Sequence, residues 1–336
     1  MTAIGNALTM TLVEQAVLAP SSHNTQPWRF RVSEDTVDLF ADRTRALPVN
    51  DPDDRELTIS CGAALMNVRV AAAHAGVGVS LQVLPSVDEP DWLARVTLGV
   101  RADARSGEAA LLGSIARRRT YRKRFAPRPV DDEVIRRLCD AAIIEHASLQ
   151  PIAGEVERDA VAALVSEGDA RQWGNPSWRR ELAAWMHPRR RGDGLTLPGL
   201  AVPVAQLVVR TFDMGGGIGA RDRDLAEASP LLAVLETPGD TTEDWLVAGQ
   251  ALQRVLLTAC HWGVQASYLN QPIQETALRT RLRETIGLAA FPQVLLRFGY
   301  PVEPVPAAPR RSVADVLDEW RCAGRPGVGE GSGREL

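Results

Sequence analysis

The sequence predicts an α+β fold that contains two copies of one structural unit, and two observations support this. Segments with the apolar spacing of helices are mixed with short apolar runs typical of strands, and the two kinds do not alternate strictly. The second observation is an internal repeat. The segment that starts at Cys61 recurs from Ala248, and seven residue pairs match at one separation of 187 positions, as in His74 and His261.

The order of helices and strands follows from these patterns. Apolar residues recur at helical spacing in the segments 8–18, 55–74, 108–118, 131–142, 178–185, 242–261 and 276–285. Short apolar runs bounded by polar residues, glycine or proline predict strands at 28–32, 37–40, 79–84, 95–100, 231–235, 265–269 and 294–298. The repeat helices that begin near Gly62 and Gly249 are rich in alanine and glycine, so we expect them to pack closely as a pseudo-twofold interface.

A polar turn separates the first expected helix from the first strand. It reads Ala19-Pro20-Ser21-Ser22-His23-Asn24-Thr25-Gln26-Pro27-Trp28. The first proline ends the helix, and the second is expected to hold Gln26 in an extended conformation. The short side chains of Ser21, Ser22 and Asn24 offer donors and acceptors suited to a flat polar ligand. An ordinary capped loop has a similar composition. His23 could face either the ligand or solvent, and solvent is the favoured interpretation.

A basic segment lies in the second copy, and it reads Arg118-Arg119-Thr120-Tyr121-Arg122-Lys123-Arg124-Phe125. Together with the polar turn it resembles two motifs of the nitroreductase-like FMN flavoproteins. In that family the arginine segment binds the FMN phosphate and the turn lies along the flavin. The resemblance therefore implies a nitroreductase-like fold that binds FMN. In the family the arginine segment precedes the turn, whereas here the order is inverted.

The internal repeat explains the inverted order. The first copy, 1–105, keeps the turn but has no recognisable arginine segment before it, and the second copy, 106–322, keeps the arginine segment. A weak echo of the turn at 146–151 retains Gln-Pro but lacks the serine pair and the asparagine. Nitroreductase homodimers take the two motifs of each site from different subunits. The resemblance thus implies an intramolecular pseudo-dimer, a monomer with one FMN per chain; 323–336 are expected to form a disordered tail.

The resemblance also assigns the site. The expected cofactor-binding residues are Pro20, Ser21, Ser22, Asn24, Gln26, Arg118, Arg119, Thr120, Arg122, Gly263, Ser267, Arg310 and Arg311. The arginines would hold the phosphate, because a guanidinium supplies charge and a fork of donors. The serines and the asparagine of the turn would contact the flavin edge, and the backbone of 263–267 would lie near its reactive edge. No side chain is expected to be catalytic, because the flavin N5 carries the chemistry.

Composition and charge exclude several classes of protein. A net charge of −4 and a pI near 5.8 argue against a nucleic-acid partner. No apolar run approaches the about 20 residues that span a bilayer, and the N-terminus lacks a signal sequence, so no membrane partner is expected. The four cysteines and five histidines show no metal-ligand spacing. We therefore expect a cytoplasmic globular protein without a metal.

One region, 186–228, has several glycines and prolines and little periodicity. We expect an inserted lid here, with the glycine run at 215–219 as a flexible loop. The strings at 42–47, 269–272 and 292–297 resemble the dormancy-associated, Acg-like subgroup of the family, which shares the two-copy layout. In that subgroup a lid can cover the flavin.

Three functions remain compatible with these motifs. The first is an NAD(P)H-dependent oxidoreductase that passes hydride through FMN to a small-molecule electron acceptor, such as a nitroaromatic or a quinone. The second is a flavin-sequestering or storage protein whose lid closes the flavin face. In the third, FMN only connects the two copies. The retained phosphate ligands predict FMN binding in each case.

Overall fold

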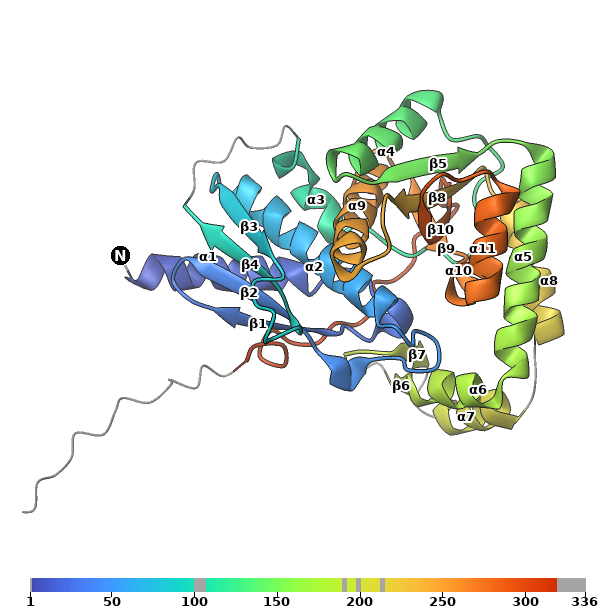
Figure 1. Ribbon diagram of the computed structural model, residues 1–336, viewed down its shortest axis with the longest axis horizontal. Coiled ribbons are helices and arrows are strands. Elements are labelled where there is room, and N and C mark those ends of the chain that lie inside the picture. The colour runs from blue at the N-terminus through green and yellow to red at the C-terminus, as the bar shows by residue number, and fades with distance from the viewer. Residues whose placement is uncertain (1, 100–106, 189–191, 198–200, 212–214, 319–336) are drawn as a thin grey trace, which may run out of the picture.

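The computed structural model describes residues 2–99, 107–188, 192–197, 201–211 and 215–318. Two halves lie side by side, each with one antiparallel four-stranded sheet (Figure 1). The expected domain boundary between 105 and 106 and the expected tail, 323–336, fall outside the described residues.

In the first half, one helix precedes the sheet and one crosses between its two strand pairs. The elements are α1 Thr2–Ala16, β1 Trp28–Val32, β2 Thr36–Ala41, α2 Arg55–His74, β3 Val79–Val83 and β4 Trp92–Leu98. The strands are ordered β1-β2-β4-β3. Short apolar side chains of α1 and α2 fill the space against the sheet and form the core of this half.

The second half repeats this topology. Its corresponding elements are α4 Asp132–Ile144, β5 Ser148–Ile152, β8 Leu231–Thr237, α9 Thr242–His261, β9 Gln265–Tyr268 and β10 Phe291–Gly299. The strand order β5-β8-β10-β9 matches that of the first sheet, with α9 in the place of α2. The prediction of two fused α+β copies is therefore confirmed. A short helix, α3 Leu112–Ile115, takes the place of the longer helix expected at 108–118.

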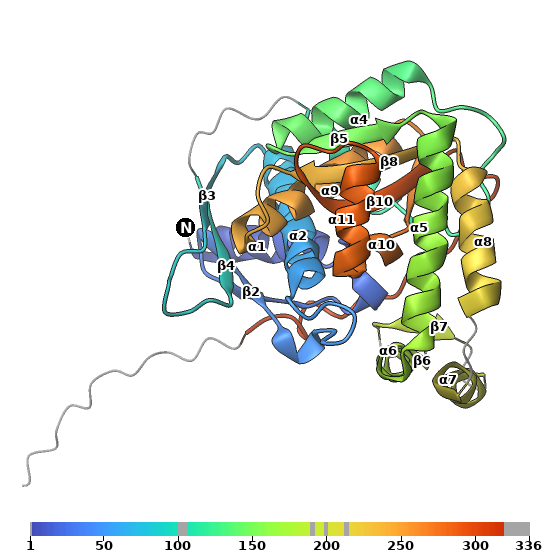
Figure 2. The same ribbon diagram turned by 45° about the vertical axis from the view of Figure 1, so that its right-hand side comes forward.

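A large insertion separates the first two strands of the second sheet. It contains α5 Glu155–Gly174, α6 Pro176–Ala184, β6 Met186–Pro188, β7 Leu195–Leu197, α7 Val202–Thr211 and α8 Gly215–Glu227. Two further helices, α10 Gln271–Gln274 and α11 Thr276–Thr285, lie between β9 and β10. Figure 2 shows α5 to α8 gathered on the side away from the first sheet. The insertion thus begins well before the predicted 186, and the prediction of a loop at 215–219 is wrong, because α8 begins there.

The central helices α2 and α9 cross where both lack side chains. A Cβ on Gly62 would collide with the carbonyl oxygen of Leu246, and one on Gly249 with that of Ile59. The predicted close packing of the repeat helices is therefore confirmed. Farther along, the α2 guanidinium of Arg69 donates to Glu145 at 2.6 Å, which joins the halves through a buried ion pair.

The second half lacks the polar turn altogether. Only residues 145–147 separate α4 from β5, whereas α1 and β1 are separated by 17–27. His146 has φ 58° two positions before β5, as Gln26 has φ 52° two positions before β1. The correct counterpart of Gln26 is thus His146, and the Gln-Pro echo at 150–151 lies within β5. The expectation that Gln26 is extended is also wrong, because its φ lies in the left-handed region.

Candidate functional site

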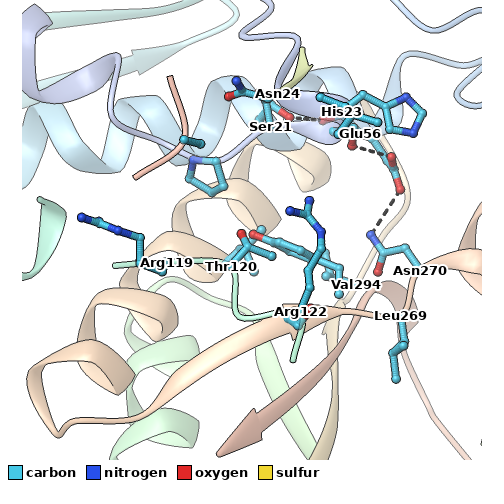
Figure 3. A pocket seen from close by; sticks show the side chains of 18 of the residues that line it. Ser21, His23, Asn24, Glu56, Arg119, Thr120, Arg122, Leu269, Asn270 and Val294 are labelled. Atoms are coloured by element: carbon cyan, nitrogen blue, oxygen red, sulfur yellow. Dashed lines mark hydrogen bonds between the residues drawn. The ribbon is translucent and has the colours of Figure 1, made fainter. Parts of the chain in front are cut away.

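A cavity of about 940 Å³ lies between the halves. Its walls come from the polar turn of the first half, the basic segment of the second half, the insertion and the segment 305–310. Figure 3 shows Ser21, His23 and Asn24 on one wall and Arg119, Thr120 and Arg122 on the facing wall. The two motifs, far apart in sequence, therefore meet at one cavity.

Side-chain hydrogen bonds hold the polar turn in an uncommon conformation. Residues Ser22–Asn24 form a single 3₁₀ turn, in which His23 has φ 47° and Asn24 has φ 56°. Ser21 Oγ accepts from the Gln26 backbone N–H at 2.9 Å. Three residues in the left-handed region within one short turn indicate backbone strain that the surrounding contacts must offset.

Glu56, in the first turn of α2, connects this turn to the second half. Its carboxylate accepts from Ser22 Oγ at 2.5 Å, from Gln274 Nε2 at 2.9 Å and from Asn270 Nδ2 at 3.2 Å. The side chain is buried and lines the cavity (Figure 3). Glu56 belongs to no motif in the sequence. The one feature that could have indicated it is its position at the start of a repeat helix.

The basic segment joins the second sheet at its β9 edge. Thr120 forms a parallel bridge with Ala266, and the Tyr121 N–H donates to the Ala266 carbonyl at 2.9 Å. The Arg119 N–H donates to Gln265 Oε1 at 2.9 Å. These bonds fix the backbone, so that successive side chains of the segment reach the cavity.

Arg118 and Arg310 converge on the end of the first half's opening segment. Arg118 and Arg310 both donate to the Leu18 carbonyl, at 3.0 Å and 3.2 Å. Arg310 also donates to Asn24 Oδ1 at 3.0 Å. Arginines from the second half therefore contact the turn of the first half, in the arrangement that the sequence predicted for a composite site.

These arginines carry positive charge without acidic partners. Burial lowers the pKa of Arg118 and of Arg122, and burial together with the charges of Arg118 and Arg119 lowers the pKa of Arg310 to about 9. Within the described part of the chain, no carboxylate forms an ion pair with these three guanidinium groups. An anion bound in the cavity would offset this charge.

Ten of the thirteen predicted residues line the cavity, namely Pro20, Ser21, Ser22, Asn24, Arg118, Arg119, Thr120, Arg122, Ser267 and Arg310. Gln26 lies behind the wall: its Nε2 donates to the Gly192 carbonyl and its Oε1 accepts from the Arg311 N–H, both at 2.9 Å. Arg311 likewise faces the first half, where it pairs with Asp42 at 3.6 Å. Gly263 follows the end of α9 with φ 77° and does not line the cavity.

Two further side chains, His23 and Tyr268, line the cavity although the sequence did not predict them there. His23 lines the cavity, and burial, opposed by Glu56, lowers its pKa to about 4, so it is neutral near pH 7. Tyr268 also lines it, with a buried hydroxyl that has no partner within the described residues. Burial raises its pKa, against the charges of Arg118 and Arg122. The strand pattern at 265–269 predicted the backbone there but not this contact.

Two other structural features are absent from the described part of the chain. No helix in that part combines the length and the apolar character needed to cross a membrane. Nor do its residues bring together three or more histidine, cysteine or acidic side chains that could hold a metal ion.

Comparison with known proteins places this chain in a family. The sequence model described as "Nitroreductase family" matches residues 115–300, which is more than half of the chain. Among solved structures, the FMN- and NADPH-dependent nitroreductase NfnB of Sphigopyxis sp. strain HMH is 18% identical, with a TM-score of 0.41 over 62% of this chain and 98% of its own. The NADPH:FMN oxidoreductase of Vibrio harveyi is 14% identical, with a TM-score of 0.39 over 67% of this chain and 79% of its own.

Relatives of similar length match the whole two-copy layout. The Mycobacterium tuberculosis H37Rv protein named "Putative NAD(P)H nitroreductase Rv3131" is 33% identical over 92% of this chain and 90% of its own. The protein acg of the same strain, named likewise, is 30% identical over 91% and 93%. The family match and these relatives together show that the chain belongs to the nitroreductase family.

Proposed function

We propose that the cavity binds one FMN per chain and that the protein is an NAD(P)H-dependent oxidoreductase. The observation that carries the proposal is a set of cavity-lining guanidinium groups, those of Arg118, Arg122 and Arg310, which face a polar turn and have no acidic ion-pair partner among the described residues. Such groups suit a phosphate dianion, since each guanidinium offers a fork of donors to its oxygens.

The cavity also has a suitable size and chemistry. Its volume of about 940 Å³ lies near the upper end of the about 300–1,000 Å³ typical of ligand sites. Thr120 adds a hydroxyl beside the arginines, and Ile59, Leu252 and Val294 add apolar surface for an aromatic ring. The fit supports FMN over an anion alone, because a bare phosphate would leave these apolar walls without a partner.

FMN would supply hydride transfer through its N5, from NAD(P)H to an acceptor such as a nitroaromatic or a quinone. The residues of this chain would bind and orient. The arginines hold the phosphate end, and the turn sets the edge of the ring. The two relatives named as NAD(P)H nitroreductases support this reaction class.

One observation favours the alternative, a flavin-sequestering protein. The insertion contacts the turn directly, because Asn24 Nδ2 donates to the Gly194 carbonyl at 3.3 Å and the Gly194 N–H donates to the Asn24 carbonyl at 3.1 Å. Asp193 of the same segment pairs with Arg45. A segment held in this way could cover the flavin face that substrates need.

Flavin stoichiometry and reduction decide between these functions. The purified protein is mixed with NADH or NADPH without oxygen, and the visible absorbance of the flavin is followed. Rapid bleaching of one FMN per chain, reversed by a quinone, supports the oxidoreductase. Bleaching by dithionite but by neither nicotinamide supports sequestration.

A pair of triple variants tests the location of the site. Replacing Arg118, Arg122 and Asn24 with alanine is expected to abolish FMN copurification. The matched control replaces the exposed residues His146, Ser148 and Gln150 in the second half and is expected to leave one FMN per chain. Two FMN per chain in the unchanged protein would contradict the single site.

A further inference from the structure

A second group of polar side chains lines the cavity where the insertion packs against α10. Asp169 comes from α5, Asp222 from α8 and Gln271 from α10. We refer to these three residues as the acidic corner. The FMN motifs assigned above include none of them.

One amide nitrogen holds both carboxyl groups of the acidic corner. Gln271 Nε2 donates to Asp222 Oδ2 at 2.8 Å and to Asp169 Oδ1 at 3.2 Å. These two bonds fix the orientation of the amide. Asp169 Oδ2 and Gln271 Oε1 are then buried acceptors without a partner among the described residues, and Asp169 is only 3% exposed. The corner therefore presents unused acceptors, and its donors are already engaged.

Two glycines bring the three elements close enough to build the corner. A Cβ on Gly168 of α5 would lie 2.8 Å from the Gln271 Cβ. A Cβ on Gly219 of α8, one turn before Asp222, would lie 3.5 Å from the Asp169 Cβ and 3.2 Å from Ser166 Oγ. The acidic corner is thus a consequence of close backbone packing.

The charges around the corner leave its carboxyl groups unpaired. In the described part of the chain, no cationic side chain forms an ion pair with Asp169 or Asp222. Arg221, Arg297 and Arg122 act on Asp222 at longer range, and Arg297 donates to two backbone carbonyls instead. Burial, together with the charge of Asp222, raises the pKa of Asp169 to about 7, and burial raises that of Asp222.

We propose that the acidic corner is a subsite for a ligand group with several N–H donors, an amidinium, an ammonium or a carboxamide, on the second substrate that shares the cavity with FMN. The proposal rests on the proposed function, since it specifies the substrate of the same site. Two adjacent carboxyl groups and a free amide oxygen match such a group and disfavour a carboxylate. The arginine-lined part of the cavity has the opposite preference.

Three flat probes of one shape test the subsite: benzamidine, benzamide and benzoate. Their affinities for the FMN-loaded protein are measured by ligand-observed NMR. The double variant Asp169→Asn, Asp222→Asn is compared with Glu167→Gln, Asp224→Asn, which removes two charges from the same helices where they form surface ion pairs. We expect benzamidine and benzamide to bind at least about tenfold more weakly to Asp169→Asn, Asp222→Asn than to the unchanged protein, and equally well to the control variant. The affinity for benzoate should be the same in all three proteins.

The pH dependence of probe binding gives a second measurement. Binding an N–H donor favours the ionised form of Asp169, so benzamidine affinity should rise several-fold between about pH 6 and about pH 8. This rise should be absent in Asp169→Asn.

Several outcomes would overturn the subsite. Equal affinities of both double variants for benzamidine would do so, as would a soaked crystal with ordered water alone at Asp169. FMN affinity is measured separately by fluorescence quenching, and the probe titrations are repeated on flavin-free protein. Loss of probe binding with FMN binding retained confirms the subsite. A protein that never binds FMN contradicts the proposed function. In that case the titrations on flavin-free protein decide whether the subsite exists.

Discussion

Arginines that have no carboxylate partner among the described residues give the cavity its chemical character at the residue scale. Removing a guanidinium from water costs free energy, and in most buried sites a carboxylate offsets this cost. Here Arg118 and Arg310 donate to a carbonyl and an amide, which are weaker partners than a carboxylate. The site is therefore expected to gain stability when an anion binds.

Arg310→Gln tests this expectation. Loss of a charge-assisted contact to phosphate should weaken FMN binding about 10- to 100-fold, measured by quenching of flavin fluorescence. The control, Arg117→Gln, removes an exposed arginine that donates to the Gly113 carbonyl and lies outside the cavity. It should leave FMN affinity unchanged. Equal affinity of both variants would show that Arg310 does not contact the ligand.

Asp51 gives a prediction for pH. Its carboxylate accepts from the Leu57 N–H at 2.9 Å, and burial together with the charge of Glu56 raises its pKa to about 7. The unfolded chain releases this proton at lower pH than the folded protein does. The stability that the proton contributes is therefore present below about pH 4 and lost as pH rises to about 7.

Asp51→Asn should remove this fall, because the amide oxygen can still accept from Leu57 but does not ionise. Urea unfolding across the window should show a decrease in the free energy of unfolding that is smaller by on the order of 1–3 kcal/mol in the variant. Asp53→Asn, an exposed change in the same loop, should retain the wild-type slope. A parallel slope in Asp51→Asn would mean that Asp51 is already ionised at low pH.

At the scale of elements, the sequence predicted the helices whose buried face is apolar. Helices α2 and α9 show this pattern, and the repeat at one separation predicted their contact. Helix α5 was missed because its buried face includes Gly168, Asp169 and Gln172, which interrupt the apolar spacing. Asp169 and Gln172 line the cavity. Helix α8 was missed because it begins with glycines, one of which packs against α5.

The candidate site was predictable only where a motif carries it. The turn and the arginine segment were found because their residues are contiguous. Glu56, Tyr268 and the acidic corner come from separate elements, and their proximity depends on how α2, β9 and the insertion pack. The spacing of residues in one sequence does not predict contacts between separate elements.

The crossing of α2 and α9 gives a prediction at this scale. Gly249→Ala places a methyl group against the Ile59 carbonyl, so the helices must separate, and the free energy of unfolding should fall by about 1–3 kcal/mol. Gly113→Ala is the matched control, since nothing lies within 4 Å of its Cβ position in α3. It should be neutral or slightly stabilising, because alanine favours a helix. Equal effects in urea unfolding would contradict close packing at the crossing.

At the scale of the whole molecule, the two halves have diverged in complementary ways. The first half supplies the polar turn, whereas the second has only 145–147 at the matching place. The second half supplies the arginine segment and also accommodates the insertion between β5 and β8. An intact site therefore depends on contacts that cross between the halves, and we expect a monomer with one FMN.

The C-terminal segment makes this dependence testable. After β10 the chain crosses to the first half, where the Phe30 N–H donates to the Val316 carbonyl at 2.7 Å and the Asp318 N–H donates to the Phe30 carbonyl at 2.8 Å. Val316 is fully buried in the first core. On its way the segment places Arg310 beside Asn24.

A chain that stops after Pro304 should therefore lose both the phosphate contact of Arg310 and the segment that bridges to the edge of β1 at Phe30. We expect it to copurify with little FMN and to unfold at a lower temperature, since burial of Val316 alone contributes about 1.5–3 kcal/mol. A chain that stops after Cys322, where the expected tail begins, should retain one FMN and the full melting temperature. Absorbance of the released flavin and thermal unfolding measure both. If the shorter chain kept its flavin, the site would be complete without the C-terminal crossing, and Arg310 would be a structural residue of the turn.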